Sequence, residues 1–402
     1  METFVSFILT IAAALLAVPV VIFLIEMIAA AISSRRHVAP AAGANSDQRP
    51  RLVVLMPAHN ESVGLLPTLA DIKRQLLPGD RVVVVADNCT DDTAAAALAH
   101  GAEVVERHDP TRRGKGYALD FGLQHLSSDP PRIVIMVDAD CRLAGNAIDE
   151  LARTCAATGR PVQALYLMTA PAVSQINQQV AEFAWRVKNW MRPLGLMALR
   201  LPCQLMGAGM AFPWDMIRSA DLANGWVVED LKLGLDLASH GHPPIFCPSA
   251  RVTSEFASSA SAAGTQRERW ERGHISTILT TVPRLFCKAV IRRDRNLLTL
   301  ALDSAVPPLS LLAILVIGMF AVASIGALLG FASSALAVST ATALAFLLAA
   351  CLAWMQCGRD VLPVDSILSI APYVLRKFGL YSVILTNKTD AQWIRTDRAK
   401  SE

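Results

Sequence analysis

The chain has 402 residues, with 37 Lys and Arg against 34 Asp and Glu, so its net charge is only +3. This balance excludes the dominant basic surface that is typical of a nucleic-acid-binding protein. Hydrophobic residues make up 53% of the chain and charged residues 18%, whereas soluble domains average about 25% charged residues. The composition therefore excludes a disordered chain and indicates segments of membrane-spanning character.

The first such segment lies at the N-terminus. Residues 4–32 carry one charge, Glu26, and a membrane span needs about 20 apolar residues. Arg35 and Arg36 follow the run, whereas a cleaved signal peptide, the alternative, carries its positive charges before a shorter apolar core. The order of charges predicts an anchor over 1–34, with the following residues in the cytoplasm. The small and polar residues 35–50 are typical of a linker.

The second apolar segment lies near the C-terminus. Residues 305–357 contain no Asp, Glu, Lys or Arg, which is enough for two spans with a turn at 330–334. Three spans return the basic tail, residues 358–402, to the cytoplasm, where we expect part of it to lie at the membrane interface.

A basic segment, residues 283–304, precedes these two spans. Its cations follow one another at steps of four, four and three residues, which is one face of a helix: Arg284, Lys288, Arg292 and Arg295. A basic amphipathic helix next to a span is typical of a helix that lies on the bilayer surface. An ordinary solvated helix face is the alternative.

The remaining residues, 51–282, alternate between strand and helix patterns. The expected strands are 51–56, 81–86, 103–105 and 133–137, and the expected helices are 63–77, 91–99 and 117–126. The strand segments are continuously apolar, which is typical of a parallel sheet buried on both faces. The sequence therefore predicts a doubly wound α/β domain.

Acidic residues follow three of these strands. Glu61 follows the first strand, Asp87 ends the second, and Asp138 and Asp140 follow the fourth. Because ligands bind at the carboxyl ends of the strands in such sheets, we expect one site here. Two carboxylates one residue apart can share a divalent cation with diphosphate oxygens. The alternative for this pair is a solvated strand exit.

Two further segments carry charged groups before or within helices. The loop around Lys115 could bind a phosphate or a base carbonyl, or form a plain basic turn. Glu229 and Asp230 begin an amphipathic helix, where acids are also favoured by the helix dipole alone.

The segment Gln266–His274 is rich in hydrogen-bonding groups and holds one Trp. Arg269 could bind a diphosphate through two hydrogen bonds, and Trp270 could stack on a sugar ring. The alternative is a charged helix surface with Glu–Arg pairs.

Taken together, these motifs resemble the membrane-embedded family 2 inverting glycosyltransferases, which include cellulose, hyaluronan, chitin-oligosaccharide and poly-N-acetylglucosamine synthases. The matching motifs are PAHNE (57–61), DNCTDDT (87–93), RGKGYAL (113–119), VDAD (137–140), GAGMAF (207–212), VVED (227–230) and QRERW (266–270). The resemblance implies a GT-A fold with a UDP-sugar donor and Mg²⁺ or Mn²⁺.

The resemblance also implies roles for individual residues. Asp87 and Lys115 match positions that hold uridine, and Glu61 falls in the first motif of the donor site. Asp138 and Asp140 match the motif that meets nucleotide and metal, and Asp230 matches the general base. The positions that shape the acceptor end and the diphosphate are Glu229, Gln266, Arg269 and Trp270.

The function implied is synthesis of a β-linked exopolysaccharide at the plasma (bacterial inner) membrane by a multi-pass protein with a cytoplasmic catalytic domain. Its partners would be a UDP-sugar, a polysaccharide or lipid-linked acceptor and membrane lipids. Because only three spans are visible, a homodimer, a separate polysaccharide export protein and transfer of one sugar to a lipid all stay open. The sequence also departs from the family pattern at His59 and at Asn88-Cys89.

Overall fold

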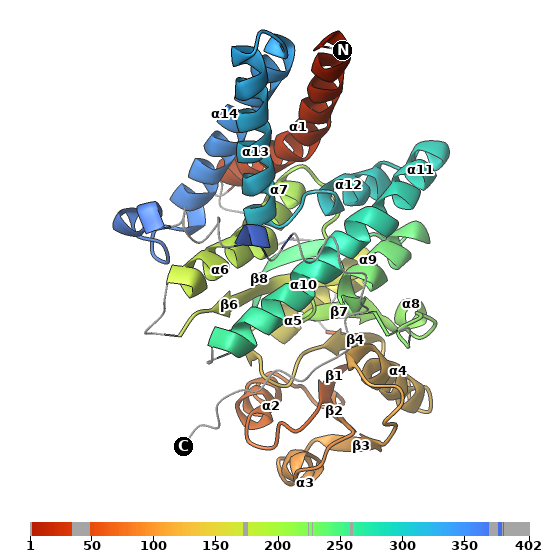
Figure 1. Cartoon of the computed structure of the whole chain (residues 1–402). Coiled ribbons are helices and arrows are strands. Elements are labelled where there is room, and N and C mark those ends of the chain that lie inside the picture. Colours follow the sequence, from red (N-terminus) through yellow and green to blue (C-terminus); the bar gives the residue numbers. More distant parts are fainter. Residues whose placement is uncertain are drawn as a thin grey trace. The chain divides into compact units, whose positions relative to one another are not determined.

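A computed structural model of the chain (Figure 1) describes residues 2–33, 49–171, 176–223, 225–226, 228–257, 260–369, 377–379 and 381. The chain forms two compact units. The sheet unit comprises residues 38–171, 201–273 and 391–402, and the helical unit comprises residues 1–37, 172–200 and 274–390. Most of the predicted linker (35–50) and most of the predicted tail (358–402) lie outside the described residues.

The sheet unit is built on one eight-stranded sheet in the order β3-β2-β1-β4-β7-β6-β8-β5. Strands β3, β2, β1 and β4 are parallel, whereas β7 is antiparallel to both β4 and β6. The strands are β1 (Leu52–Ala58), β2 (Arg81–Asp87), β3 (Glu103–Arg107), β4 (Ile133–Met136), β5 (Arg142–Leu143), β6 (Val162–Thr169), β7 (Met210–Pro213) and β8 (Ile245–Glu255).

Helices α2 (Leu65–Lys73), α3 (Thr93–Ala99) and α4 (Lys115–Leu126) connect the parallel strands. The predicted strands and helices of residues 51–137 are thus confirmed, with ends displaced by one to a few residues. The core on one face of the sheet consists of alternate strand residues such as Val83 and Val85, which pack with Leu119 and Leu123 of α4. The remaining helices of this unit are α5 (Ala147–Thr158), α8 (Trp214–Ile217), α9 (Glu229–Ser239) and the first part of α10 (Ala260–Thr280).

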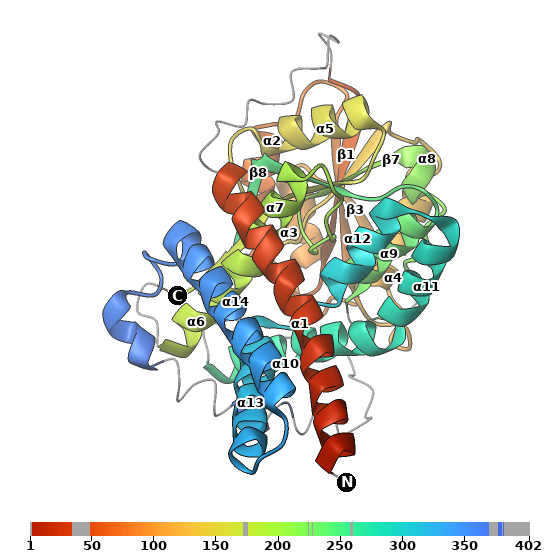
Figure 2. The same ribbon diagram turned by 90° about the horizontal axis from the view of Figure 1, so that it is seen from above.

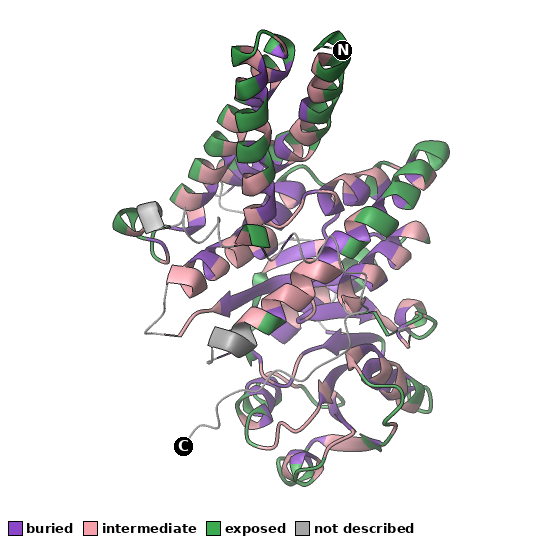
Figure 3. Ribbon diagram, viewed as in Figure 1, coloured by how far each residue is buried: buried purple, intermediate pink, exposed green. Residues whose placement is uncertain are grey.

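In the helical unit, α1 (Glu2–Ser33), α13 (Leu309–Leu328) and α14 (Ser333–Cys357) are long and apolar enough to span a membrane. These are the three predicted spans. Helix α14 packs along both α1 and α13 (Figure 2). The predicted turn between α13 and α14 is confirmed, since Gly330 has a φ of 89° and Ala332 a φ of 70°. Exposed residues lie along the length of all three helices (Figure 3), as expected of surfaces that face lipid.

The same unit holds α6 (Ile176–Arg186), a π-helical turn (Val187–Met191) and α7 (Arg192–Ala198), which are inserted between β6 and β7 in the sequence. Arg192 is buried between Glu26 of α1 and Asp303 of α12 (Arg295–Ser304), and its Nε lies 2.7 Å from Glu26 Oε2. The one charge within the first apolar run is therefore paired.

The basic segment 283–304 forms two helices, so the prediction of one continuous helix was wrong. Helix α11 (Val282–Arg292) ends at Arg293, whose φ is 53°, and α12 follows. The Asp294 side chain caps α12 by accepting hydrogen bonds from the backbone amides of Asn296 and Leu297. Arg295 therefore belongs to a different helix from the other three predicted cations.

Candidate active site

The acids that were predicted to share one sheet edge follow neighbouring strands. Strands β2, β1 and β4 lie side by side and parallel, so the loops that follow them leave the sheet at the same edge. The loops after β1 and β2 are hydrogen-bonded to each other. The Thr90 amide donates to Asn60 Oδ1 over 2.7 Å, and the Glu61 amide donates to Thr93 Oγ1 over 2.8 Å. The edge is therefore a connected surface.

Lys115, at the first position of α4, lies among the acids at the end of β4. Its Nζ is 2.5 Å from Asp138 Oδ1 and 3.9 Å from Glu229 Oε1, and it donates to the Gly207 carbonyl over 2.6 Å. Burial raises the pKa of the Asp138 carboxyl, and the charge of Asp140 raises it further, while the Lys115 ammonium opposes both. This ammonium thus balances part of the negative charge of these half-buried carboxylates.

Glu229 and Asp230 form the first turn of α9. A Cβ added to Gly207 would lie 3.3 Å from Asp230 Oδ2, so this carboxylate lies directly against the Gly207 turn. Burial raises the pKa of the Glu229 carboxyl to about 7, and the Asp230 and Asp138 charges add to that effect. We call Lys115, Asp138, Glu229 and Asp230 the lysine–carboxylate cluster.

Helix α10 carries the predicted Gln-x-x-Arg-Trp residues, and its next turn lies close to this cluster. A Cβ on Gly273 would lie 2.8 Å from Val228 Cγ1, at the residue before Glu229. The charge of Glu229 also acts on Arg269, whose pKa is lowered by burial and partly restored by that carboxylate. Gln266 is buried, and its Oε1 accepts no hydrogen bond from the described residues.

The two possibilities for this helix apply to different arginines. Arg272 pairs with Glu268 at 3.0 Å, one helical turn away, as expected of a charged helix surface. Arg269 is half-buried, its Nε is buried, and the charge of Glu229 acts on its guanidinium. Trp270, the last predicted residue of this motif, is half-buried on the same helix.

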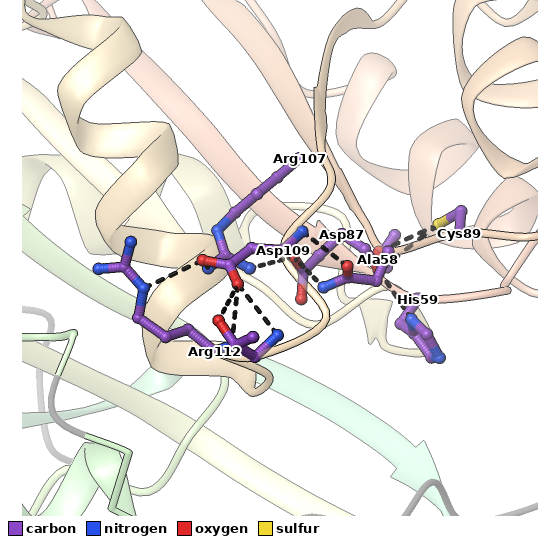
Figure 4. A network of polar contacts seen from close by, with 9 residues as sticks. Ala58, His59, Asp87, Cys89, Arg107, Asp109 and Arg112 are labelled. Carbon is purple, nitrogen blue, oxygen red and sulfur yellow. Dashed lines mark hydrogen bonds and ion pairs between the residues drawn. The ribbon is translucent and has the colours of Figure 1, made fainter.

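A second polar network surrounds Asp87 at the end of β2 (Figure 4). Arg107 Nη1 donates to Asp87 Oδ1 over 2.6 Å, and the Asn88 side-chain amide donates to the same oxygen over 3.0 Å. Asp87 Oδ2 accepts no hydrogen bond from the described residues, so it is available to a ligand. His59 contacts the Asp87 carbonyl through Nδ1 at 2.7 Å.

Arg107 was not identified from the sequence, although a cation at the end of a strand was a signal that could have found it. Its guanidinium lies 5.6 Å from the centre of the Tyr117 ring and also pairs with Asp109. Tyr117 in turn approaches the loop before α9, because its hydroxyl lies 3.2 Å from the position of a Cβ on Gly225. Arg107 therefore connects the Asp87 network to the first turn of α4.

Gln163 of β6 is a second residue that the sequence analysis missed. This buried side chain donates to the Ala208 carbonyl over 2.9 Å and accepts from the Met206 amide over 2.7 Å. It thereby holds the turn whose Gly207 carbonyl binds Lys115. A buried Gln within an apolar strand was the available signal, since such a group needs partners.

Glu61 has a different environment from the other predicted acids. Its side chain lies over the start of α2, where Oε2 would be 2.6 Å from a Cβ on Gly64. The gap left by this glycine therefore makes room for the carboxylate beside a helix N-terminus, a favourable position for a negative charge.

The predicted metal ligands, Asp138 and Asp140, fit a cation that is shared with a substrate. Among the described residues, no three His, Cys, Asp or Glu side chains form a group that could hold a metal ion. Mg²⁺ is commonly bound by one or two carboxylates together with substrate phosphates and water. Two adjacent carboxylates match that donor set, whereas they do not match a closed structural site.

Comparison with known sequences agrees with this geometry. The profile described as glycosyltransferase like family 2 matches residues 50–273, which is more than half of the chain. The chain belongs to this family. Its fold is accordingly the GT-A-like glycosyltransferase fold, and the chain is a glycosyltransferase with three candidate membrane spans.

Similar curated proteins cover different shares of the chain. An uncharacterized glycosyltransferase of Mycobacterium tuberculosis is 30% identical over 196 residues, which are 45% of this chain and 84% of that protein. The low-salt glycan biosynthesis hexosyltransferase of Haloferax volcanii is 37% identical over 102 residues, or 24% of this chain and 23% of that protein. The 4,4'-diaponeurosporenoate glycosyltransferase of Staphylococcus aureus is 35% identical over 114 residues, or 28% and 29%.

Among solved structures, a mannosyltransferase from Pyrobaculum calidifontis in complex with GDP-Man and Mn²⁺ is similar over 95% of this chain and 100% of that chain. The TM-score is 0.53 and the identity 18%. At this identity the similarity shows the fold.

Proposed function

We propose that this chain is a metal-dependent, membrane-bound, inverting glycosyltransferase that moves a sugar from a UDP-sugar to a growing exopolysaccharide. Its catalytic domain would face the cytoplasm at the plasma membrane. The observation that carries the proposal is the lysine–carboxylate cluster, with the half-buried Arg269 beside it. Together they supply a base and cationic groups in one partly buried site.

Asp230 is the proposed general base. A sugar hydroxyl is a poor nucleophile, so its attack requires that a carboxylate accept its proton. Asp230 lies at the α9 N-terminus against the Gly207 turn, close to Lys115. Its half-buried neighbour Glu229 has a different role, because it lies near Lys115 and acts on the charge of Arg269.

Arg269 and the Asp138–Asp140 pair would act on the leaving group. As the bond to the nucleotide breaks, negative charge grows on the diphosphate, and the half-buried guanidinium of Arg269 can meet that charge with two hydrogen bonds. A divalent cation held by Asp138 and Asp140 would supply further neutralisation of the diphosphate. A single displacement of this kind inverts the configuration at the anomeric carbon of the sugar and needs no second catalytic carboxylate.

Asp87 is the proposed contact for the nucleotide base. Because Arg107 and Asn88 both donate to Oδ1, the other oxygen can accept a hydrogen bond from the imide N–H of uracil. Guanine also presents an N–H donor to such an oxygen, so GDP-sugars belong in every donor panel.

The acceptor has two candidates. The Gln-x-x-Arg-Trp segment supports a polysaccharide acceptor through its resemblance to polymer synthases. The three apolar helices support a lipid acceptor instead, as does the similarity to a transferase named for diaponeurosporenoate. The size and solubility of the product distinguish the two.

The deciding experiment compares Asp230→Asn with Asp236→Asn in membranes that carry the full chain. Asp236 lies on the same helix and pairs with Lys232 at the exposed surface, so it is a matched control. Both variants receive a panel of radiolabelled UDP- and GDP-sugars with Mg²⁺ or Mn²⁺, and products are separated by size and solvent extraction. We expect Asp230→Asn to lower transfer about 10²- to 10⁴-fold and Asp236→Asn to leave it unchanged.

Product of high mass from a UDP-sugar supports the polysaccharide proposal, whereas label confined to the organic phase supports the lipid acceptor. Equal transfer by both variants would show that Asp230 is not the base. Binding of UDP to purified Asp230→Asn serves as the control for folding.

A further inference from the structure

One tryptophan of the sheet unit is exposed just before the helix that carries the proposed base. Trp226 is 37% exposed. Among the described residues of this unit it is the only exposed Phe, Trp or Tyr side chain, since the others, Tyr117 and Trp270 included, are buried or half-buried. Because tryptophan is highly buried on average, the exposure of this one needs a physical reason.

The segment that carries Trp226 contacts the site before and after this residue. A Cβ on Gly116, in the first turn of α4, would lie 2.4 Å from the Leu222 carbonyl oxygen, so the backbone of the segment passes directly against α4. Two residues after the tryptophan, Val228 lies against Gly273 of α10. Trp226 therefore lies between two contacts with helices of the candidate active site.

The indole lies beside the start of α9. Lys232 Nζ is 5.8 Å from the centre of the Trp226 ring, and Lys232 is the fourth residue of this helix. Asp230 is its second residue and follows Trp226 by four positions, so their Cα atoms are at most about 14 Å apart. An acceptor whose reacting hydroxyl meets Asp230 can therefore bring one of its sugar rings to the indole.

The charges near the indole favour an uncharged ligand. The carboxylates of Glu229 and Asp230 follow Trp226 closely and repel a phosphate group. The Lys232 ammonium is already paired with Asp236. An aromatic ring has a negative face, against which the C–H groups on the apolar face of a pyranose can pack. A sugar ring therefore fits this surface, whereas an anionic lipid headgroup does not.

We propose that Trp226 stacks on a pyranose ring of the acceptor and thereby places the acceptor hydroxyl at Asp230. This inference rests on the proposed function, in which Asp230 takes the proton of that hydroxyl. It names the acceptor class as a glycan, because stacking at Trp226 requires a sugar ring near the reacting end. An acceptor that carries its hydroxyl on a lipid chain offers no such ring.

The test compares Trp226→Phe, Trp226→Leu and Trp226→Ala in membranes that carry the full chain. Each variant receives the radiolabelled nucleotide sugar that wild-type membranes transfer, with Mg²⁺ or Mn²⁺. The label is then divided between transferred product and free sugar released by hydrolysis. Both reactions use the same donor site, but only transfer needs the acceptor.

Two controls accompany these variants. Leu98→Ala controls for the loss of an exposed apolar side chain, because Leu98 is 66% exposed on α3. Binding of UDP to each purified variant controls for folding and for the donor site.

We expect Trp226→Ala and Trp226→Leu to lower transfer about 5- to 10-fold, while donor hydrolysis and UDP affinity stay within about twofold of the wild type. Trp226→Phe should keep most of the transfer, because phenylalanine retains an aromatic face. Leu98→Ala should transfer as the wild type does.

Equal transfer by Trp226→Leu and Trp226→Phe would overturn the inference, because any apolar side chain would then suffice, as at a lipid or protein contact. Equal losses of transfer and hydrolysis would also overturn it, since Trp226 would then act on the donor. Wild-type membranes that give neither product nor metal-dependent UDP release would instead contradict the proposed function, and the inference with it.

Discussion

Lys115 Nζ lies 2.5 Å from Asp138 Oδ1, although the two residues are 23 positions apart in the sequence. The ammonium thus occupies one oxygen of the carboxylate that is expected to bind the metal ion of the donor complex. A divalent cation and the Lys115 ammonium compete for the Asp138 carboxylate, unless Lys115 pairs with the diphosphate of the donor instead. Metal and nucleotide should therefore bind with positive coupling.

Replacement of Lys115 tests that competition without measuring turnover. Lys115→Met removes the competing cation, so Mn²⁺ should bind without nucleotide roughly tenfold more tightly than to the wild type, which corresponds to about 1.4 kcal/mol. Electron paramagnetic resonance of free Mn²⁺ measures this directly. Lys232→Met is the control, because Lys232 pairs with Asp236 away from the cluster. Unchanged Mn²⁺ affinity in Lys115→Met would refute the competition.

Two neighbouring arginines of α10 should respond differently to the same substitution. Arg269 is half-buried and feels the charge of Glu229, so Arg269→Lys should lower kcat/KM about 10- to 100-fold by removing a contact of two hydrogen bonds to the diphosphate. Arg272 forms an i,i+4 pair with Glu268, so Arg272→Lys should change kcat/KM less than about twofold. Steady-state kinetics over a range of donor concentrations gives kcat/KM for both variants. Similar losses in the two would contradict the proposal that Arg269, and not Arg272, contacts the diphosphate.

The raised pKa of Glu229 predicts how stability depends on pH. Its value is about 7 in the folded chain against an ordinary 4.5, so the unfolded chain releases this proton at a lower pH. Stability should therefore fall as the pH rises from about 4.5 to about 7, by at most about 3 kcal/mol from this group. The thermal unfolding midpoint should decline less between pH 5 and pH 8 in Glu229→Gln than in wild type.

Glu268→Gln is the control for that experiment, since the carboxylate of Glu268 is partly exposed and pairs with Arg272. The pH response of this variant should match the wild type. A decline in Glu229→Gln as steep as in wild type would mean that the pKa of Glu229 is not raised in the folded chain.

Arg107 should affect nucleotide binding by orienting the Asp87 side chain. Both side chains are 9% exposed, and loss of one partner of such a pair typically costs about 3–5 kcal/mol. Arg107→Lys keeps the charge but loses the planar fork, so we expect weaker UDP binding by about tenfold and a raised KM for the donor with kcat less affected. Calorimetric titration with UDP gives the affinity.

Arg112→Lys is the matched control, because Arg112 pairs with Asp109 at the surface, 3.0 Å away. UDP affinity should stay near wild type in this variant. Equal UDP affinity in both variants would show that the Asp87 network does not hold the base.

The first half of the sheet unit was predictable because its signals are local. Strands β1, β2 and β4 are continuous apolar runs that end at polar loops, and a run of this kind is buried on both faces wherever it lies. The membrane helices were predictable for the same reason. Strand β7 was not predicted, because it is short and runs antiparallel between β4 and β6, and no residue pattern within it encodes that pairing.

The sequence by itself therefore determined the class of the fold, the three apolar helices and the positions of the acids at the strand ends, since each follows from periodicity or composition over neighbouring residues. Only the tertiary structure decided which charges meet. In the folded chain Lys115 pairs with Asp138, and Arg107 pairs with Asp87. Arg272 pairs with Glu268, whereas Arg269 interacts with Glu229. Ion pairs of this kind depend on the distance between atoms and on burial, and the fold alone determines both.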